Sequence, residues 1–394
     1  MRIRKVVYLL LLVALPTVFM LSCQSDARNS TRIPPVVKKN KKQWEKDALL
    51  SLSDLISRGI DLDANYFKRA RIYFDQEQYK LALEDINSAI DEQENVGEYF
   101  LLRGKVNREL GDIDKGLEDA ERAEALQQGS PELYILLADL LQAKDRFREA
   151  DKYLTHAMKL TPHDASAFYV RGMIQAKQGD SLASLASLDY AMTNNPGMLR
   201  AYLQSIIINR KLHNPGQALV INNKAIKRFP QNAELYYERG QIYNGLSRPD
   251  TAIIYYQKAV QVNPKYREAL AQIADLGIKN RMYNKAVVAL TQLLQVDPQY
   301  PQIHNLLGYS YEKSGNFYKA REHYSITLAS DESDRAAHNG MWRMRRDEAG
   351  ESYSNEANDH DGPLLDTSRV KLNLIQPRKT INIPVDSSRK VKIQ

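Results

Sequence analysis

Apolar residues along most of the chain follow a helical spacing, and the pattern repeats every 34 residues. In the segment 233–264, Tyr236, Gly240 and Tyr243 fall on one face of a helix, because residues three or four apart share a face. Tyr256 and Ala259 fall on the apolar face of a second helix. The segment therefore predicts two amphipathic helices that form a helical hairpin.

Small residues and prolines recur with the same period. Position 8 of each unit is Ala or Gly with one exception, and position 20 is Ala, Gly or Ser. Small side chains let the two helices touch, since a larger one would force their backbones apart. Counted from residue 63 to residue 334, the pattern predicts an all-α solenoid of eight 34-residue units. Five prolines share one phase of this period: Pro162, Pro196, Pro230, Pro264 and Pro298.

This pattern resembles the tetratricopeptide repeat (TPR), whose aromatic, small and proline positions are all matched by the residues from Tyr236 to Pro264. The fifth unit departs from it. Ile206 replaces a small residue, Asn209 replaces an aromatic residue, and Asn222 lies where the second helix should be apolar. We expect this unit to be kinked or loosely packed.

The first 22 residues have the pattern of a lipoprotein signal peptide. Arg2, Arg4 and Lys5 precede a fifteen-residue apolar run, which is too short for a comfortable membrane span. The run leads to Ser22 and Cys23, which resemble the end of a bacterial lipobox, and Cys23 is the only cysteine in the chain. We predict that Cys23 carries a lipid such as palmitate; the alternative is a free thiol.

The remaining ends are predicted as flanking segments. Residues 23–42 are polar and basic and predict a flexible tether, whose lysines either meet anionic headgroups or are simply solvated. Residues 43–62 and 335–349 predict capping helices, which the ends of a solenoid need. Gln24, which follows Cys23 where Asp would resemble an inner-membrane signal, favours a periplasm-facing outer-membrane location over the inner membrane.

Residues 350–394 predict a disordered tail that contains strand-like segments. Val370, Leu372 and Leu374 alternate with polar residues, and this period of two is typical of a strand. Three interpretations stay open: the tail adds to the sheet edge of a partner, it lies in the groove of its own solenoid, or it is a linker.

Charge and motifs argue against catalysis and nucleic-acid binding. The net charge of +7 falls to +4 without Arg2, Arg4 and Lys5, and the basic residues form no stripe. The sequence has no nucleophile elbow, zinc-binding motif or phosphate loop, so we expect no catalytic or metal-binding residue, no cofactor and no small-molecule substrate. Three histidines near the last unit are interpreted as isolated surface residues: His304, His323 and His338.

The TPR resemblance implies that partner proteins or peptides bind in a concave groove lined by the first helix of each unit. The positions that bind peptides in the family form an apolar strip rimmed by arginine, typical of a partner site. The alternative is that some of these residues pack between neighbouring units. The eight predicted groove residues are Tyr169, Met173, Arg200, Leu203, Ile207, Arg210, Tyr237 and Gln241.

These features predict a non-enzymatic scaffold or adaptor, anchored by lipid to a bacterial envelope membrane, that assists assembly of an envelope or secretion complex. The alternative is a regulatory adaptor that recruits cell-wall hydrolases or other envelope enzymes. A fused glycosyltransferase is disfavoured, because no stretch outside the repeats is long enough for a catalytic domain.

Overall fold

The computed structural model describes residues 40–126 and 129–348, and their regular elements are all α-helices. The chain divides into two compact units, one within Met1–Asn95 and the other within Val96–Gln394. The predicted signal peptide, Cys23, the tether up to residue 39 and the predicted tail lie outside the described residues.

The first unit contains three helices, α2 (Lys41–Ser57), α3 (Leu62–Asp75) and α4 (Tyr79–Glu92). The side chain of Asn40 caps α2 by accepting a hydrogen bond of 2.8 Å from the backbone N–H of Gln43. Helix α2 packs against α3, and α3 packs against α4. Helix α2 therefore covers one side of the first repeat, as a capping helix does.

The second unit consists of fifteen helices in its described part. The first seven are α5 (Gly97–Leu110), α6 (Ile113–Ala125), α7 (Pro131–Ala143), α8 (Phe147–Leu160), α9 (Ala165–Lys177), α10 (Ser181–Asn194) and α11 (Leu199–Lys211). The rest are α12 (Pro215–Arg228), α13 (Ala233–Gly245), α14 (Pro249–Val262), α15 (Arg267–Lys279), α16 (Tyr283–Val296), α17 (Ile303–Lys313), α18 (Phe317–Ser330) and α19 (Arg335–Glu348).

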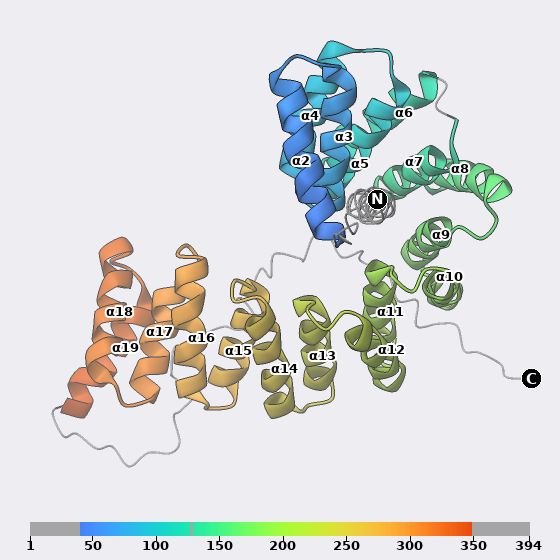
Figure 1. Cartoon of the computed structure of the whole chain (residues 1–394). Coiled ribbons are helices and arrows are strands. Elements are labelled where there is room, and N and C mark those ends of the chain that lie inside the picture. The colour runs from blue at the N-terminus through green and yellow to red at the C-terminus, as the bar shows by residue number, and fades with distance from the viewer. Residues whose placement is uncertain (1–39, 127–128, 349–394) are drawn as a thin grey trace, which may run out of the picture. The chain divides into compact units, whose positions relative to one another are not determined.

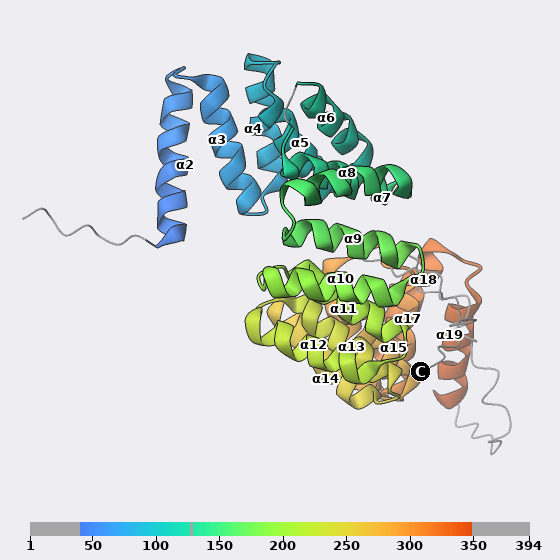
Figure 2. The same cartoon turned by 90° about the vertical axis from the view of Figure 1, so that its right-hand side faces the viewer.

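Consecutive helices form hairpins, and within the second unit consecutive hairpins pack on one another. The most extensive contacts lie within the pairs α3–α4, α5–α6, α7–α8, α9–α10 and so on to α17–α18, as Figure 1 shows. In Figure 2, α9 lies below α7 and α8, and α10 lies below α9. Eight hairpins that repeat every 34 residues, with α2 before the first and α19 after the last, confirm the predicted all-α solenoid of helical hairpins.

Every hairpin turns through one residue in the left-handed conformation, always at position 15 of the repeat. A left-handed backbone costs about 1–2 kcal/mol for residues with a side chain, so glycine suits this position. Three repeats have glycine here, and five hold the same conformation with other residues. The eight residues, with φ between 53° and 85°, are Glu77, Gly111, Asp145, Gly179, His213, Ser247, Arg281 and Gly315.

The two helices of a hairpin fit together through complementary residue sizes at positions 8 and 24. A Cβ atom added to Gly240 would lie 2.4 Å from Cε1 of Tyr256, and one added to Gly308 would lie 2.7 Å from Cδ1 of Tyr324. Non-bonded carbon atoms in proteins do not approach one another so closely. Both tyrosine rings are fully buried, so glycine at position 8 makes the space that a large residue at position 24 fills.

The fifth repeat uses the reverse arrangement. The expected kink was wrong, whereas the expected looser packing fits the structure, since the contact between α11 and α12 is the least extensive of the eight hairpins. Its helices α11 and α12 are uninterrupted and as long as their counterparts. The large residue, Ile206, stands at position 8, and the smaller Asn222 stands at position 24. Asn222 is fully buried, and its amide donates a hydrogen bond of 2.8 Å to the carbonyl oxygen of Leu235 in the next repeat.

Among the described residues, no helix combines the length and the apolar character that crossing a membrane requires.

Candidate protein-interaction surface

The eight predicted groove residues lie on the first helices of three successive repeats. Helix α9 carries Tyr169 and Met173, and α13 carries Tyr237 and Gln241. Helix α11 carries the other four: Arg200, Leu203, Ile207 and Arg210. The spacing of three, four or seven residues within each helix places them on one face of that helix.

The four most apolar of these side chains are buried within the chain itself. The exposed fractions of Met173, Leu203 and Ile207 are 8%, 8% and 7%, and that of Tyr237 is 6%. The Tyr237 ring packs against Tyr256, with 5.5 Å between the ring centroids. The packing alternative stated from the sequence fits these four residues, and their contact with a partner stays a prediction.

The polar members of the set bond to groups inside the chain. Nη1 of Arg200 lies 2.9 Å from Oε1 of Glu109 on α5, and Nε of Arg210 lies 3.2 Å from Oε2 of Glu238 on α13. Nε2 of Gln241 donates to the hydroxyl of Tyr237 at 2.8 Å. Arg200 remains 57% exposed at its side chain and is the most accessible of the eight.

Tyr169 is half-buried beside these charges. The guanidinium carbon of Arg200 lies 5.9 Å from the centre of its ring, a cation–π contact. Burial raises the pKa of Tyr169 to about 12, so the phenol stays neutral at physiological pH. Tyr169 therefore presents a neutral aromatic ring beneath an exposed arginine.

A buried ion pair connects α5 and α7 next to this position. Nε of Arg108 donates to Oδ2 of Asp139 at 2.5 Å, and Nε2 of Gln142 donates to Oδ1 at 3.0 Å. Burial disfavours the charged form of Asp139, but the charge and hydrogen bonds of Arg108 outweigh it and hold the pKa of Asp139 below its ordinary value. The first helices are therefore joined by ionic contacts as well as by apolar packing.

Glu238 shows the opposite balance. It is buried with 4% of its surface exposed, and burial raises its pKa above the ordinary range although Arg210 partly opposes the shift. The pairs Arg108–Asp139 and Arg210–Glu238 were missed by the sequence analysis, because nothing in the local pattern marks which carboxylate an arginine on another helix will meet.

A different arginine series follows the repeat itself and was also missed. In the first two repeats, the arginine at position 7 pairs with an aspartate at position 23 across the hairpin, at 2.7 Å in both Arg69–Asp85 and Arg103–Asp119. The spacing of sixteen residues is visible in the sequence and could have revealed these pairs. In the fourth repeat position 7 is Arg171, and position 23 is Ser187.

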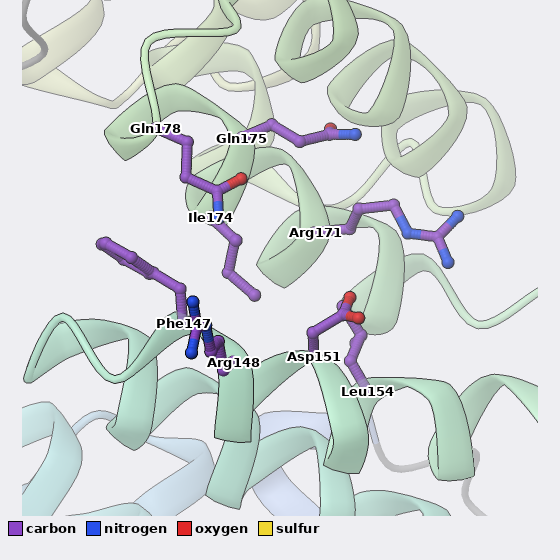
Figure 3. Close-up of a pocket in the computed structure, with 8 residues that line it drawn as sticks. All are labelled: Phe147, Arg148, Asp151, Leu154, Arg171, Ile174, Gln175 and Gln178. Atoms are coloured by element: carbon purple, nitrogen blue, oxygen red, sulfur yellow. The ribbon is translucent and has the colours of Figure 1, made fainter.

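Arg171 lines a cavity of about 440 Å³ between α8 and α9, which belong to successive repeats. Cavities of this volume are typical of sites for small ligands or side chains. As Figure 3 shows, α8 contributes Phe147, Arg148, Asp151 and Leu154, and α9 contributes Arg171, Ile174, Gln175 and Gln178. The cavity combines an apolar floor with charged side chains, and no residue of it was predicted as a site.

His304 on α17 and His323 on α18 form a pair, so their interpretation as isolated residues was wrong. Their Nδ1 atoms lie 3.0 Å apart, and the Tyr311 ring stacks on His323 at 5.6 Å. His338 is not part of the pair, since its Nε2 contacts the carbonyl oxygen of Glu332. No group of three or more potential metal ligands occurs within residues 40–126 and 129–348.

The pair is expected to make the stability of the last repeat depend on pH. Burial lowers the pKa of both histidines below 6.5, and His304 lowers that of His323 further. The unfolded chain therefore binds more protons below about pH 6.5, so stability is complete above that pH and is lost as the pH falls. We expect the Tm to fall less between about pH 7.5 and 5 in His304→Gln/His323→Gln than in the wild type.

The control is His338→Gln, which removes an exposed histidine near the pair and should keep the pH dependence of the wild type. Circular dichroism at each pH measures the Tm of all three proteins. An unchanged pH dependence in the double variant would contradict the prediction.

The Tetratricopeptide repeat family matches residues 67–131, 135–198, 233–266 and 272–337, together more than half of the chain. Anaphase-promoting complex subunit 3 of Schizosaccharomyces pombe is 24% identical over 202 residues, covering 51% of this chain and 30% of that protein. Cellulose synthase operon protein C of Pseudomonas fluorescens is 25% identical over 200 residues, covering 50% of this chain and 16% of that protein. The chain thus spans less than a third of the length of these two relatives.

Among solved structures, the human IFIT1 dimer is similar with a TM-score of 0.52. The sequence identity is 16%, and the match covers 73% of this chain and 69% of that chain. At this identity the likeness shows a shared helical-repeat fold.

Proposed function

Because the chain belongs to the tetratricopeptide repeat family, we propose that it is a non-enzymatic scaffold for other proteins, anchored by a lipid on Cys23 to a bacterial envelope membrane. Proteins of this family are protein-interaction scaffolds. The observation that carries the proposal is that the repeats make up almost all of the described residues. Of the described helices, only α2 and α19 lie outside the eight hairpins. The described chain thus offers repeat surface for binding and no separate domain for catalysis.

The partner surface proposed on the first helices centres on Arg200 and Tyr169. Arg200 is 57% exposed, and the Tyr169 ring lies beneath it. Aromatic and arginine side chains are enriched among the residues that contribute most to protein binding. The buried Leu203 belongs to the same apolar cluster against which Tyr169 packs.

The anchoring part of the proposal rests on sequence. Cys23 is the only cysteine, and it follows a basic start and an apolar run that ends at Met20. Gln24 favours an outer-membrane location, where the repeats would face the periplasm and assist assembly of an envelope or secretion complex. The tail, with its alternating Val370, Leu372 and Leu374, would add a second binding segment.

Cys23→Ser is expected to abolish lipid attachment, because serine lacks the sulfur atom that forms the thioether. Palmitate labelling and fractionation of cells test this: the wild type should be labelled and sediment with membranes, whereas the variant should be unlabelled. Ser25→Ala, two residues away, is the matched control and should behave as the wild type. Labelling of Cys23→Ser at the wild-type level would refute the anchor.

The scaffold role is tested by cross-linking and purifying the full chain from membranes. Recovery of defined envelope proteins with the wild type, and their loss from the Cys23→Ser preparation, is the expected result. Recovery of cell-wall hydrolases would favour the regulatory-adaptor alternative, and absence of any reproducible partner would contradict both.

A further inference from the structure

Arg171 lacks the carboxylate that the arginine at the same position has in the first two repeats. Its Nη2 atom contacts the sulfur of Met158 at 2.8 Å, and its guanidinium lies 5.4 Å from the ring centre of Phe168. Neither group is an anion, and no carboxylate of the described residues forms an ion pair with Arg171. The fourth repeat has Ser187 where the first two have aspartate, and its hydroxyl donates to Oε1 of Gln175 at 2.7 Å.

A second unpaired guanidinium lines the same cleft. Arg148 on α8 is exposed and forms no ion pair with any described carboxylate, in contrast to its neighbour Arg146, which binds Glu149. Figure 3 shows Arg171 and Gln175 extending from the same side of α9. The cleft therefore offers two cations and an amide without an internal anion bound to them.

The floor of the cleft is apolar. Leu154 and Ile174 are 1% and 5% exposed, and the half-buried Phe147 ring lies beside them. A cavity of about 440 Å³ holds an apolar side chain in addition to a carboxylate. Charge and apolar surface together match a short acidic peptide segment better than a free ion.

We propose that the cleft between α8 and α9 binds an acidic peptide segment of a partner protein, with a carboxylate on Arg171 and the neighbouring apolar side chain against Phe147 and Ile174. Arg148, which lies beside Phe147 at the other end of the cleft in Figure 3, adds positive charge there. Asp151 lines the same cleft and accepts a hydrogen bond from a peptide N–H. Its negative charge disfavours a dianionic phosphate more than a carboxylate. This inference rests on the proposed protein-binding function and gives it a specific ligand chemistry.

The probe is a peptide with blocked ends that carries one Glu beside one Phe between glycines, labelled with an uncharged fluorophore. Fluorescence anisotropy measures its Kd for the full chain. Arg148→Gln/Arg171→Gln should raise the Kd about tenfold or more, because the charge-assisted hydrogen bonds are lost. Ser187→Asp should do the same by giving Arg171 an internal carboxylate, as in the first two repeats, without removing either arginine.

Arg239→Gln is the matched control, since Arg239 has the same position in the sixth repeat but lies over Tyr255 and outside this cleft. Its Kd should equal that of the wild type, and circular dichroism verifies that all variants are folded. The same peptide with Gln in place of Glu should bind the wild type about tenfold more weakly. Equal affinity for both peptides, or wild-type affinity in the double variant, would overturn the proposal. The proposal would also be overturned if inorganic phosphate displaced more of the peptide than chloride does at equal ionic strength.

Purification of partners with the same variants separates this inference from the function on which it rests. Loss of both probe and partners in Arg148→Gln/Arg171→Gln supports the cleft as a partner site. Loss of the probe with full retention of partners would overturn the cleft as that site and leave the scaffold role intact. Probe binding by a wild type that recovers no partners would support the cleft chemistry and refute the scaffold role.

Discussion

Gly240→Ala is expected to destabilise the sixth repeat, although alanine favours helices more than glycine does. The added Cβ atom would lie 2.4 and 2.5 Å from Cε1 and Cδ1 of the fully buried Tyr256 ring. Overpacking of this kind costs about 1–3 kcal/mol, whereas the gain in helix propensity is about 0.5–1 kcal/mol. We expect a net loss of about 1–2 kcal/mol, measured by urea unfolding followed by circular dichroism.

Two variants test the cause of this loss. Gly245→Ala, in the same helix but with no atom within 4 Å of the added Cβ, should leave stability unchanged or raise it. Gly240→Ala/Tyr256→Leu recreates the pair found in the third repeat, Ala138 with Leu154, and should recover much of the stability. If Gly240→Ala proved as stable as Gly245→Ala, the close fit at this position would be refuted.

Arg343→Ala should cost about 3–5 kcal/mol, the loss typical when one partner of a buried ion pair is removed. Nε and Nη2 of Arg343 on α19 bind Oε1 and Oε2 of Glu312 at 2.7 and 2.8 Å, with side chains only 16% and 5% exposed. The Tyr324 hydroxyl donates to the same carboxylate at 2.9 Å. Without Arg343, the nearest cation is Lys313 at 3.9 Å from Oε1, too far for a direct hydrogen bond.

The charge-free double variant Glu312→Gln/Arg343→Met separates an uncompensated charge from lost packing. It should be more stable than Arg343→Ala, because no buried charge remains without a partner. Arg146→Ala, which breaks the exposed Arg146–Glu149 pair, should leave the urea midpoint unchanged. Equal stability of Arg343→Ala and the wild type would show that α19 does not depend on this contact.

The fold could be predicted because it depends on residues that recur at fixed positions. Gly240 and Tyr256 belong to one unit, so both partners of the contact that joins α13 to α14 lie within the same 34-residue repeat. A kink was wrongly expected in the fifth repeat because each position was compared separately with the family pattern. Ile206 and Asn222 both deviate, but as a pair they fill about the same space as a small residue facing a large one.

The candidate site was predicted less well, because accessibility depends on contacts between repeats. The sequence placed the eight groove residues on the expected helices, yet it does not show how closely neighbouring first helices pack. Tyr237 is buried with its ring against Tyr256 of its own hairpin and Tyr266 just before α15. Arg200 meets Glu109, which lies 91 residues earlier. The Arg–Asp spacing of sixteen residues could be read from the sequence, but the cavity beside Arg171 could not.

The size matching at positions 8 and 24 also limits how such a gene can recombine. A crossover inside a repeat would join one first helix to the second helix of another repeat, for example Ile206 of the fifth repeat to Tyr256 of the sixth. Ile206 and Tyr256 would then face each other in a space that, in the sixth repeat, holds Gly240 and the Tyr256 ring. A crossover between repeats keeps each pair together, so whole hairpins are the unit in which this array can lengthen, shorten or exchange parts.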